Sequence, residues 1–526
     1  MPSTKRKLLT IASAIALSVG VTSCASETGS VPVPASDATP ETGGSATIVL
    51  GVEAVRGLDP AQLFNLTPSG DANRMSAIFG QLLSADASTG DVEPGLADSM
   101  VSSPDGNSWT LTLRPDLEFS DGTPLDAAAV VYNYDRILDP NTRSPLLRLL
   151  EGIDFEAVDT RTVQFTLPQP NKNFDQIVAT NLSYVGSPTA IAQGPERFAN
   201  NPVGAGPFVL REWKRDDRMT LARNDNFHDP SRPYLNEVVF LVVADPVQRV
   251  NLVASGQAQA AVPGSDLSYR KRAAQSRLSV TEAPAGGGPM FVFNTQQGPF
   301  ADVRARRAMA LALDMQDLAS VIDPGSAAPV GLYGSASAYN TGGNAPLIPQ
   351  DKERAQVLFD ELAAESGPLA FTITTAQSGL FRRTAEYLES RLGTFDNVSV
   401  DIDIVDNATM DQRVFRNRDY DVTAQIVPIA APEPNLYNLL YTGGQTNYSG
   451  MSDPALDTAL DDARSASDQA ARLDAYTRVE DIVRDQVPVL PFREQTAYTV
   501  HRPQLAGLEL RGDGTLLYEN IGYAPS

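Results

Sequence analysis

At 526 residues the chain is too long for one compact core, so two or three domains are expected. Its content of 42% hydrophobic and 20% charged residues is ordinary for a soluble globular protein. The formal net charge of −23 repels phosphate backbones and anionic lipid headgroups, which argues against nucleic acid as the main partner.

The N-terminus has the pattern of a secretory signal. The basic segment MPSTKRK precedes a short apolar run, LLTIASAIALSVGV, which is too short and too early for a membrane-spanning helix. The sole cysteine of the chain, Cys24, follows Val21-Thr22-Ser23. This resembles a bacterial lipobox, in which the cysteine becomes the lipid-carrying N-terminus, whereas the competing interpretation is a stray or buried thiol. We expect a signal peptide at residues 1–23 and lipid attachment at Cys24.

Residues 25–45, ASETGSVPVPASDATPETGGS, are rich in proline and small polar residues. Such a composition cannot form a core, so a disordered linker is expected. As a flexible coil it would span roughly 25 Å and hold a folded body clear of a membrane surface. Beyond the leader, no apolar run in the sequence approaches the ~18–20 residues needed to span a bilayer.

Folded sequence is expected from ATIVLGVE onward, which reads as a strand. Trp109, Leu111 and Leu113 alternate with polar residues and predict a half-buried strand. The turn signal Asp121-Gly122 follows, and Asp126 has the position of a helix cap before AAAVVYNYDRIL. Further strands are predicted at TVQFTL, GPFVLREW, MTLARN and VVFLVVA.

The second half of the chain alternates predicted helices and strands. A helix is expected between Asp245 and Gly256, and three consecutive glycines precede the strand-like PMFVFN. A long amphipathic helix is predicted from Asp302 to residue 322. More helices are predicted at 351–366, 380–393 and 453–486, the last split near Ser465, with strands at FTITT, VSVDIDIV, YDVTAQIV and TAYTV. This alternation is typical of an α/β layer.

The sequence offers little evidence for catalysis. His228 and His501 are far apart and lack metal-like spacing, and the sequence contains neither a G-x-S-x-G elbow nor a phosphate-binding P-loop. Ser268-Tyr269-Arg270-Lys271 matches S-x-x-K but reads better as a solvated helix face. Asp401 and Asp403 alternate with isoleucines, which indicates the wet face of a strand rather than a calcium site. We therefore expect no enzyme activity, no metal and no cofactor.

Five blocks, in the same order, resemble the family 5 extracellular solute-binding proteins of bacterial ABC importers, which include peptide and nickel binders. The blocks are IFGQLLSADASTGDVEPGLADSM, SPDGNSWTLTLRPDLEFSDGTPLDAAAVVYNYDRI, NPVGAGPFVLREWKRDDRMTLARND, FNTQQGPFADVRARRAMALALD and YNLLYTGGQTNYSGMSDPALD. Together they cover the chain from about residue 46 to its end.

The resemblance implies a periplasmic-binding-protein-like α/β fold of two lobes, with an α/β subdomain inserted in the first. Segments near Gly286–Asn294 and Pro491–Ala497 would cross between the lobes as hinges. The ligand would be enclosed between lobes that close over it and then presented to a membrane permease. The implied divisions are the lipidated cysteine and linker at 24–45, lobe I at 46–75, 187–285 and 495–526, the inserted subdomain at 76–186, and lobe II at 286–494.

In peptide-binding members of the family, ligand contacts come from four segments. The first is the loop after the first strand, and the second follows an Asp-Pro-Asn pattern in the inserted subdomain. The third is the first hinge strand, and the fourth is a strand-to-loop segment, here IVPIAAPEP. The matching residues of this sequence are Phe64 and Asn65, Leu146, Gly287 and Met290, and Val427, Pro428, Ala430 and Glu433.

The fourth segment departs from the family pattern. Peptide binders usually carry there a tryptophan, and an aspartate that pairs with the peptide ammonium. Those positions fall on Val427 and Ala430 in this sequence, and neither matches. Glu433 is a candidate replacement for the aspartate, and the competing interpretation is a helix-cap charge before NLYNLL.

Three hypotheses follow for the function. The first is a peptide-binding importer component whose ammonium partner has moved. A second is the same machine with a less charged solute, such as a sugar, a modified peptide or a siderophore-like compound. The third is an enzyme or signalling receptor on this scaffold, for which the sequence shows no catalytic constellation. We expect an extracytoplasmic, lipid-anchored monomer that works with an ABC permease.

Overall fold

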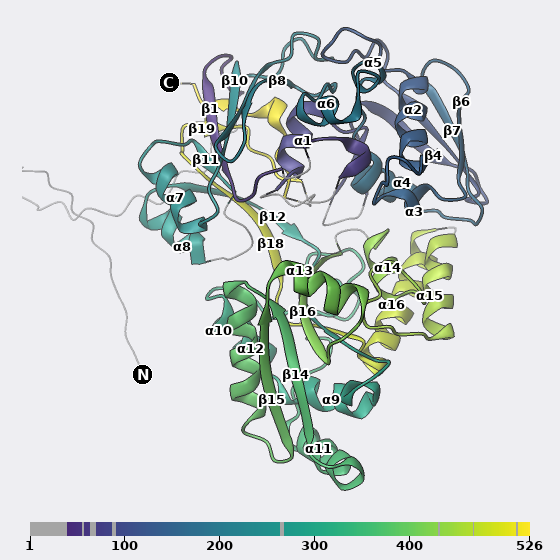
Figure 1. Cartoon of the computed structure of the whole chain (residues 1–526), viewed down its shortest axis with the longest axis vertical. Coiled ribbons are helices and arrows are strands. Elements are labelled where there is room, and N and C mark those ends of the chain that lie inside the picture. The colour runs from purple at the N-terminus through teal and green to yellow at the C-terminus, as the bar shows by residue number, and fades with distance from the viewer. Residues whose placement is uncertain are drawn as a thin grey trace, which may run out of the picture. The chain divides into compact units, whose positions relative to one another are not determined.

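The structure is a computed structural model that describes residues 39–54, 57–63, 70–86, 91–262, 268–429, 432–466, 468–511 and 514–525. Within these residues the strands form sheets of seven, five and four strands, together with two two-stranded pairs (Figure 1). Cys24 and the predicted signal peptide lie outside the described residues.

The seven-stranded sheet has its core on both faces. Along β1, Ile48 and Leu50 pack into one hydrophobic cluster with α1, whereas Val49 packs into another with α7. Strand side chains alternate between faces, so one strand serves two cores. In sheet order the strands are β12 (Ser279–Ala285), β18 (Gln495–His501), β11 (Ala260–Ala261), β1 (Ser45–Leu50), β10 (Glu237–Val242), β9 (Arg218–Arg223) and β8 (Phe208–Lys214), and the helices are α1 (Ala72–Phe79), α7 (Pro246–Ala254) and α8 (Ser268–Gln275).

The five-stranded sheet contains the segment with which the chain leaves the seven-stranded sheet. Its strand β13 lies between β16 and β17, and Met290 to Phe293 are fully buried because both faces are covered. In sheet order the strands are β15 (Val398–Val405), β14 (Leu369–Ala376), β16 (Val422–Pro428), β13 (Gly287–Phe293) and β17 (Val489–Pro491), with helices α9 (Val303–Ala312), α10 (Met315–Ile322), α11 (Lys352–Ser366) and α12 (Gly379–Leu392).

The four-stranded sheet is antiparallel, and α2 (Ala127–Leu138) packs on it. Trp109, Leu111 and Leu113 are all buried, as their alternation predicts. The Asp126 carboxylate accepts a hydrogen bond from the Ala129 amide at 2.9 Å, which confirms the predicted cap. The strands are β4 (Ala97–Ser102), β5 (Ser108–Leu113), β7 (Thr162–Thr166) and β6 (Asp154–Ala157).

The predicted helix from Asp302 to residue 322 is wrong in one respect, because it forms two helices. Leu313 is extended at the end of α9, and Asp314 caps α10 by accepting hydrogen bonds from the Gln316 and Asp317 amides. An internal aspartate that competes for backbone donors favours such a break. The predicted split near Ser465 is confirmed, since α15 (Pro454–Ser465) ends there and α16 (Gln469–Gln486) follows.

The linker ends earlier than the predicted residue 45. The Glu41 amide donates to the Tyr523 carbonyl at 2.8 Å, and the Gly43 amide donates to the Tyr234 carbonyl at 2.7 Å. Backbone hydrogen bonds therefore fix the chain before β1 begins.

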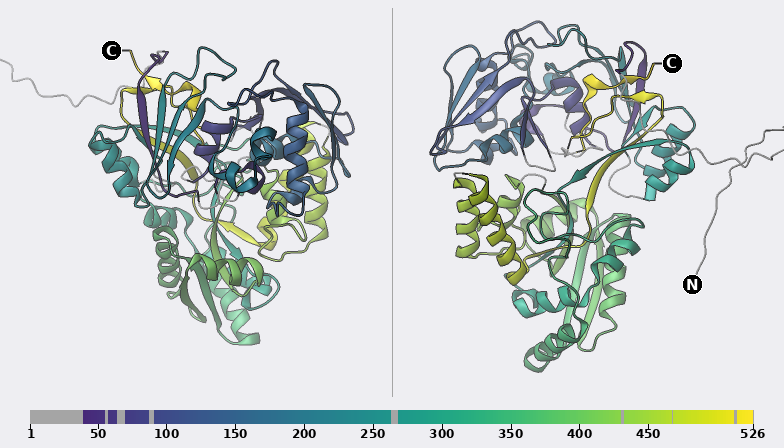
Figure 2. Two further views of the ribbon diagram at one scale, coloured as in Figure 1. Left: turned by 45° about the horizontal axis from the view of Figure 1, so that its top comes forward. Right: turned by 180° about the vertical axis from the view of Figure 1, so that it is seen from behind.

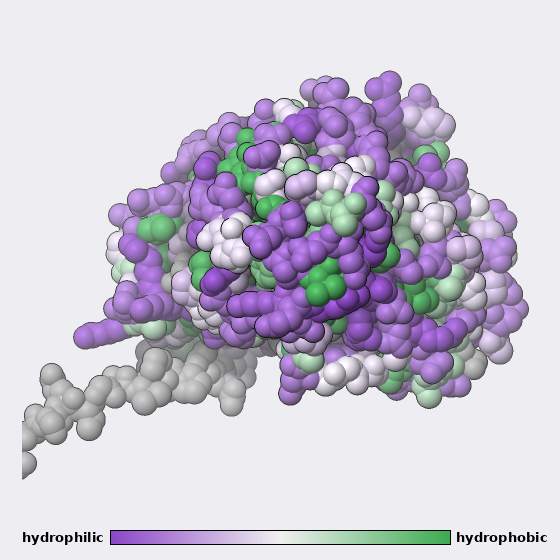
Figure 3. Space-filling view, turned by 90° about the horizontal axis from the view of Figure 1, so that it is seen from below, coloured by the Kyte–Doolittle hydropathy of each residue, from purple (hydrophilic) through white to green (hydrophobic). Residues whose placement is uncertain are grey.

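Smaller elements complete the described chain. They are the pairs β2 (Leu83–Ala85) with β3 (Val92–Pro94) and β19 (Leu505–Ala506) with β20 (Gly522–Tyr523), the helices α3 (Leu147–Leu150), α4 (Phe174–Ile177), α5 (Pro188–Ile191), α6 (Pro195–Asn200), α13 (Asn407–Met410) and α14 (Asn435–Leu440), and the short turns η1 (Pro60–Gln62), η2 (Val178–Leu182), η3 (Pro299–Ala301), η4 (Asp411–Arg416) and η5 (Tyr518–Asn520). On the face in Figure 3, hydrophobic residues form small separate patches among hydrophilic ones.

Candidate functional site

Two strands cross side by side between the seven-stranded and five-stranded sheets. Strand β12 belongs to the first sheet and β13 to the second, and only Gly286 separates them. In the opposite direction, β17 of the second sheet leads into β18 of the first. Ala285 pairs with Gln495 at the crossing. The view from behind in Figure 2 shows the two strands running between the sheets. The two segments lie where the sequence analysis places its hinges.

Glycine is required at the crossing. Gly287 has φ +77°, and a Cβ there would lie 2.3 Å from the Val427 carbonyl oxygen and 2.6 Å from the Ile429 nitrogen. At Gly288, with φ +143°, a Cβ would lie 2.7 Å from the Arg493 carbonyl oxygen. Any other residue would be strained and would collide with backbone that has little freedom to move.

Three segments meet at these glycines. The Ile429 amide, just past the end of β16, donates to the Gly286 carbonyl at 2.8 Å. The Gly287 amide donates to the Tyr333 carbonyl at 3.2 Å, which brings in the loop at 333–337. The end of β16, predicted as the fourth ligand segment, is therefore next to the strand crossing.

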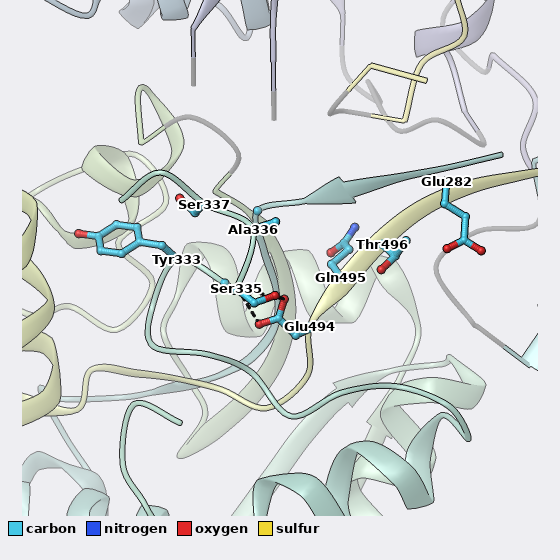
Figure 4. A pocket seen from close by; sticks show the side chains of 10 residues that line it. Glu282, Tyr333, Ser335, Ala336, Ser337, Glu494, Gln495 and Thr496 are labelled. Atoms are coloured by element: carbon cyan, nitrogen blue, oxygen red, sulfur yellow. Dashed lines mark hydrogen bonds between the residues drawn. The ribbon is translucent and has the colours of Figure 1, made fainter. Parts of the chain in front are cut away.

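A pocket of about 250 Å³ opens at this meeting point, and we call it the crossing pocket (Figure 4). Most of its lining residues are of polar type or glycine. In Figure 4 the Ser335 and Glu494 side chains point toward each other, and Gln495 and Thr496 follow Glu494 along the chain. Its lining residues are Glu282, Gly286, Tyr333, Gly334, Ser335, Ala336, Ser337, Glu494, Gln495 and Thr496.

Glu494 is held by uncharged donors. Its carboxylate accepts hydrogen bonds from the Val330 amide at 2.9 Å, the Ser335 amide at 3.1 Å and the Ser335 hydroxyl at 3.0 Å. Among the described residues, no lysine, arginine or histidine forms an ion pair with it. The Glu494 carboxylate therefore brings an uncompensated negative charge to the pocket.

The other groups of the pocket differ from Glu494 in their partners. Glu282 forms an ion pair with Arg270 at 2.6 Å, so a neighbouring cation offsets its charge. The amide oxygen Oε1 of Gln495 is buried and has no hydrogen-bond donor among the described residues. The uncompensated carboxylate of Glu494 is therefore the acceptor that distinguishes this pocket.

Glu433, the predicted ammonium partner, is paired inside the protein. Its side chain is 1% exposed, and its two oxygens accept from Arg464 at 2.5 and 2.7 Å. Burial disfavours the Arg464 cation, but the Glu433 carboxylate outweighs burial and raises the pKa of Arg464. Helix α14 begins after Pro434 with no side-chain cap bond, so the alternative interpretation of Glu433 as a helix cap is wrong.

The other predicted ligand residues lie in different settings. Leu146 and Met290 are buried in hydrophobic cores, at 8% and 0% exposure. Val427 is partly buried against the core of the five-stranded sheet, and Pro428 ends β16. Phe64, Asn65 and Ala430 lie outside the described residues. The structure thus brings Gly287, Val427 and Pro428 together at the crossing, since β13 and β16 pair there.

A second set of contacts, which the sequence analysis missed, links the region of the four-stranded sheet to α15 and α16. The Lys172 amide donates to the Arg464 carbonyl at 2.6 Å, and the Asn173 side chain donates to the Ala463 carbonyl at 3.4 Å. Nearby, burial raises the pKa of Asp175 to about 6, against the opposing effects of the Gln176 amide and Arg472. These partners are about 290 residues apart in sequence, and no local pattern signals them.

The described part of the chain lacks the features of a metal site and of a membrane-spanning helix. It contains no cluster of three or more histidine, cysteine, aspartate or glutamate side chains able to hold a metal ion. None of its helices is both long and apolar enough to cross a bilayer. His501 is fully buried, with its ring hydrogen-bonded to the Thr281 hydroxyl at 3.1 Å, and therefore has a packing role.

Comparison with known proteins identifies the family. The model of the bacterial extracellular solute-binding proteins, family 5 Middle, matches residues 91–448. The dipeptide-binding protein DppE of Bacillus subtilis is 23% identical over 449 residues, covering 79% of this chain and 81% of the relative.

Two solved structures illustrate the shared fold. DppA of Helicobacter pylori in complex with the peptide STSA has a TM-score of 0.78 at 22% identity, covering 92% of this chain and 99% of that one. AgaA of A. tumefaciens R10 in complex with agropinic acid has a TM-score of 0.77 at 23% identity, covering 92% and 99%. The expected α/β fold of the periplasmic-binding-protein type is thereby confirmed. Because the family model matches more than half of the chain, this protein belongs to the bacterial extracellular solute-binding proteins of family 5.

Proposed function

We propose that the chain is the substrate-binding lipoprotein of a bacterial ABC importer, and that it captures an oligopeptide or peptide-like solute. The observation that carries the proposal is the two-strand crossing between separate α/β sheets in a member of this family. A crossing of two strands lets two sheet-centred bodies move about a few backbone positions. The peptide assignment is supported by the dipeptide-binding name of the relative DppE and by the peptide in the DppA complex.

The proposed division follows the sheets. Lobe I comprises residues 46–75, 187–285 and 495–526, the inserted subdomain 76–186, and lobe II 286–494. The ligand would bind between the lobes and favour closure through contacts that are better in the closed state. The closed complex would then be delivered to a membrane permease. Nothing in this cycle needs chemistry on the solute, so the chain acts as a binding protein and not as an enzyme.

Lipid attachment at Cys24, with an extracytoplasmic location and a monomeric state, completes the proposal. It is supported by the signal-like leader and by the position of the sole cysteine. Fractionation of bacteria that express the full chain tests the anchor. Wild type should sediment with membranes, and Cys24→Ser should be released. Equal sedimentation of both would contradict lipidation at Cys24.

A less charged solute remains the second candidate. The stretch IVPIAAP carries no charge, and the similar AgaA structure holds agropinic acid, so the fold is not restricted to simple peptides. Native mass spectrometry of the mature protein, followed by a thermal-shift screen, separates the two candidates. Stabilisation by free di- to pentapeptides supports the first, and stabilisation by sugars alone supports the second. Stabilisation by neither class, with no co-purified solute, would contradict a solute-binding role.

A further inference from the structure

We infer that the crossing pocket is the anchor for a positively charged nitrogen of the solute, with Glu494 as its partner. The inference rests on the proposed solute-binding function and adds the chemical class of the group that is bound. A ligand ammonium or guanidinium would take the place of the missing cation beside the Glu494 carboxylate. Both groups present N–H donors to a carboxylate, in charge-assisted bonds stronger than those between neutral groups.

The Glu494 side chain is oriented before any ligand arrives. Three donors, the Val330 amide and the amide and hydroxyl of Ser335, hold its carboxylate on the wall of the pocket. A carboxylate has about four lone-pair sites, and the Ser335 amide is shared between Oε1 at 3.1 Å and Oε2 at 3.3 Å, so these three donors leave room for one more donor at Oε2. A side chain that is already held in place loses little conformational entropy when it binds.

The charge balance of the pocket favours a cation. Glu282 is paired with Arg270, whereas Glu494 is paired with no cation of the described residues. The lining contains no lysine or arginine. An anionic solute group would be repelled by the Glu494 carboxylate.

The crossing pocket is lined by residues attached to both large sheets. Gln495 and Thr496 begin β18 of the seven-stranded sheet, and Tyr333 to Ser337 form a loop tied to β13 of the five-stranded sheet. A cation at Glu494 would therefore touch residues carried by both sheets. Binding that depends on both bodies stabilises the arrangement that brings them together.

The test uses matched small peptides as probes of the mature protein. Trialanine carries an α-ammonium, N-acetyl-trialanine carries no cation, and N-acetyl-Ala-Arg-Ala carries only a guanidinium. Isothermal titration calorimetry would give the Kd of each probe for wild type, Glu494→Gln and Glu365→Gln. Glu365 is a surface residue paired with Arg304, so Glu365→Gln controls for the loss of one negative charge.

We expect wild type to bind at least one cationic probe at least tenfold more tightly than N-acetyl-trialanine. Glu494→Gln should weaken that probe about tenfold or more, and Glu365→Gln should leave it within a factor of two. The preferred probe identifies the cation, because trialanine reports an ammonium and N-acetyl-Ala-Arg-Ala a guanidinium. Equal binding of all three probes, or an unchanged Kd in Glu494→Gln, would overturn the inference and leave peptide binding intact.

Two further arms keep the test decisive. If Glu494→Gln unfolds below the assay temperature, Thr496→Arg places a guanidinium inside the same pocket and should abolish cationic-probe binding. Native mass spectrometry of the wild type completes the design. A co-purified solute without any cationic nitrogen would overturn the inference while leaving solute transport standing. Failure of every probe, with no co-purified solute, would contradict the inference and the proposed function together.

Discussion

Glu433 and Glu494 are two carboxylates that differ in how their charge is compensated. Glu433 is 1% exposed and makes a two-oxygen contact with Arg464, whose guanidinium also stacks 3.1 Å over the Tyr437 ring. Glu494 is partly buried and accepts from uncharged donors alone. A carboxylate in or near a predicted ligand segment is therefore not always free to bind a ligand. It is free only where the protein itself supplies no cation to pair with it.

The largest expected effect comes from removing the cation of the compensated pair. Arg464→Ala should lower the free energy of unfolding by about 3–5 kcal/mol, because it leaves the buried Glu433 carboxylate without a partner. Urea denaturation at pH 7 would measure the change. Arg478→Ala is the matched control, since its pair with Asp462 is about half exposed, and it should cost less than about 1 kcal/mol. Equal losses of unfolding free energy in Arg464→Ala and Arg478→Ala would show that the burial of Glu433 does not increase the cost of removing its cation.

A second variant tests the backbone that connects the two regions. Gly287→Ala should lower the free energy of unfolding by roughly 2–3 kcal/mol, because the new Cβ combines a positive φ with a close approach to the Val427 carbonyl. Gly343→Ala has a similar φ of +80° and no neighbour within 4 Å. It should therefore show only the backbone cost, about 1 kcal/mol. If the denaturation curves of Gly287→Ala and Gly343→Ala superimpose, the close backbone contacts at Gly287 do not constrain the crossing.

Asp175 is a third carboxylate to compare. It is buried, and the Gln176 amide and Arg472 offset the cost of burying its charge only in part. Its folded-state pKa of about 6 exceeds the ordinary value of 3.8, so the folded protein binds this proton more tightly than the unfolded chain. Its contribution to stability is complete below about pH 4 and is lost as the pH rises through 6. Asp175→Asn should thus gain about 1–2 kcal/mol at pH 7.5 and nothing at pH 4.

Thermal unfolding at the two pH values would measure that difference. Asp474→Asn, on the exposed side of α16, is the control and should show no such pH dependence. A gain from Asp175→Asn that is the same at both pH values would contradict the burial argument.

The smallest expected effect is on ligand affinity. Glu433→Gln should change the Kd of the best-binding tripeptide less than about threefold, because the Glu433 carboxylate already faces Arg464 and not a ligand. Calorimetry alongside Glu494→Gln makes the contrast direct. A loss of affinity in Glu433→Gln as large as that in Glu494→Gln would reverse the roles assigned to the two carboxylates.

Much of the secondary structure was predictable, because its signals are local. Asp126 caps its helix, the helix predicted at 380–393 is α12, and the alternation around Trp109 produces a buried strand face. The failure at 302–322 is also local, since Asp314 competes with the helix for backbone donors. The family was equally accessible, because its five blocks are continuous stretches of sequence.

Local sequence accounts for most of the helices and strands, for the family and for the absence of charge in IVPIAAP, although not for the break between α9 and α10. Tertiary structure alone decided that Glu433 meets Arg464, and that Glu494 meets Val330 and Ser335. It also decided that the three glycines at 286–288 form a strand crossing and not a simple turn. The physical reason is that charge compensation and close backbone approach depend on groups that are 31 to about 200 residues apart. Local patterning carries no information about such pairs.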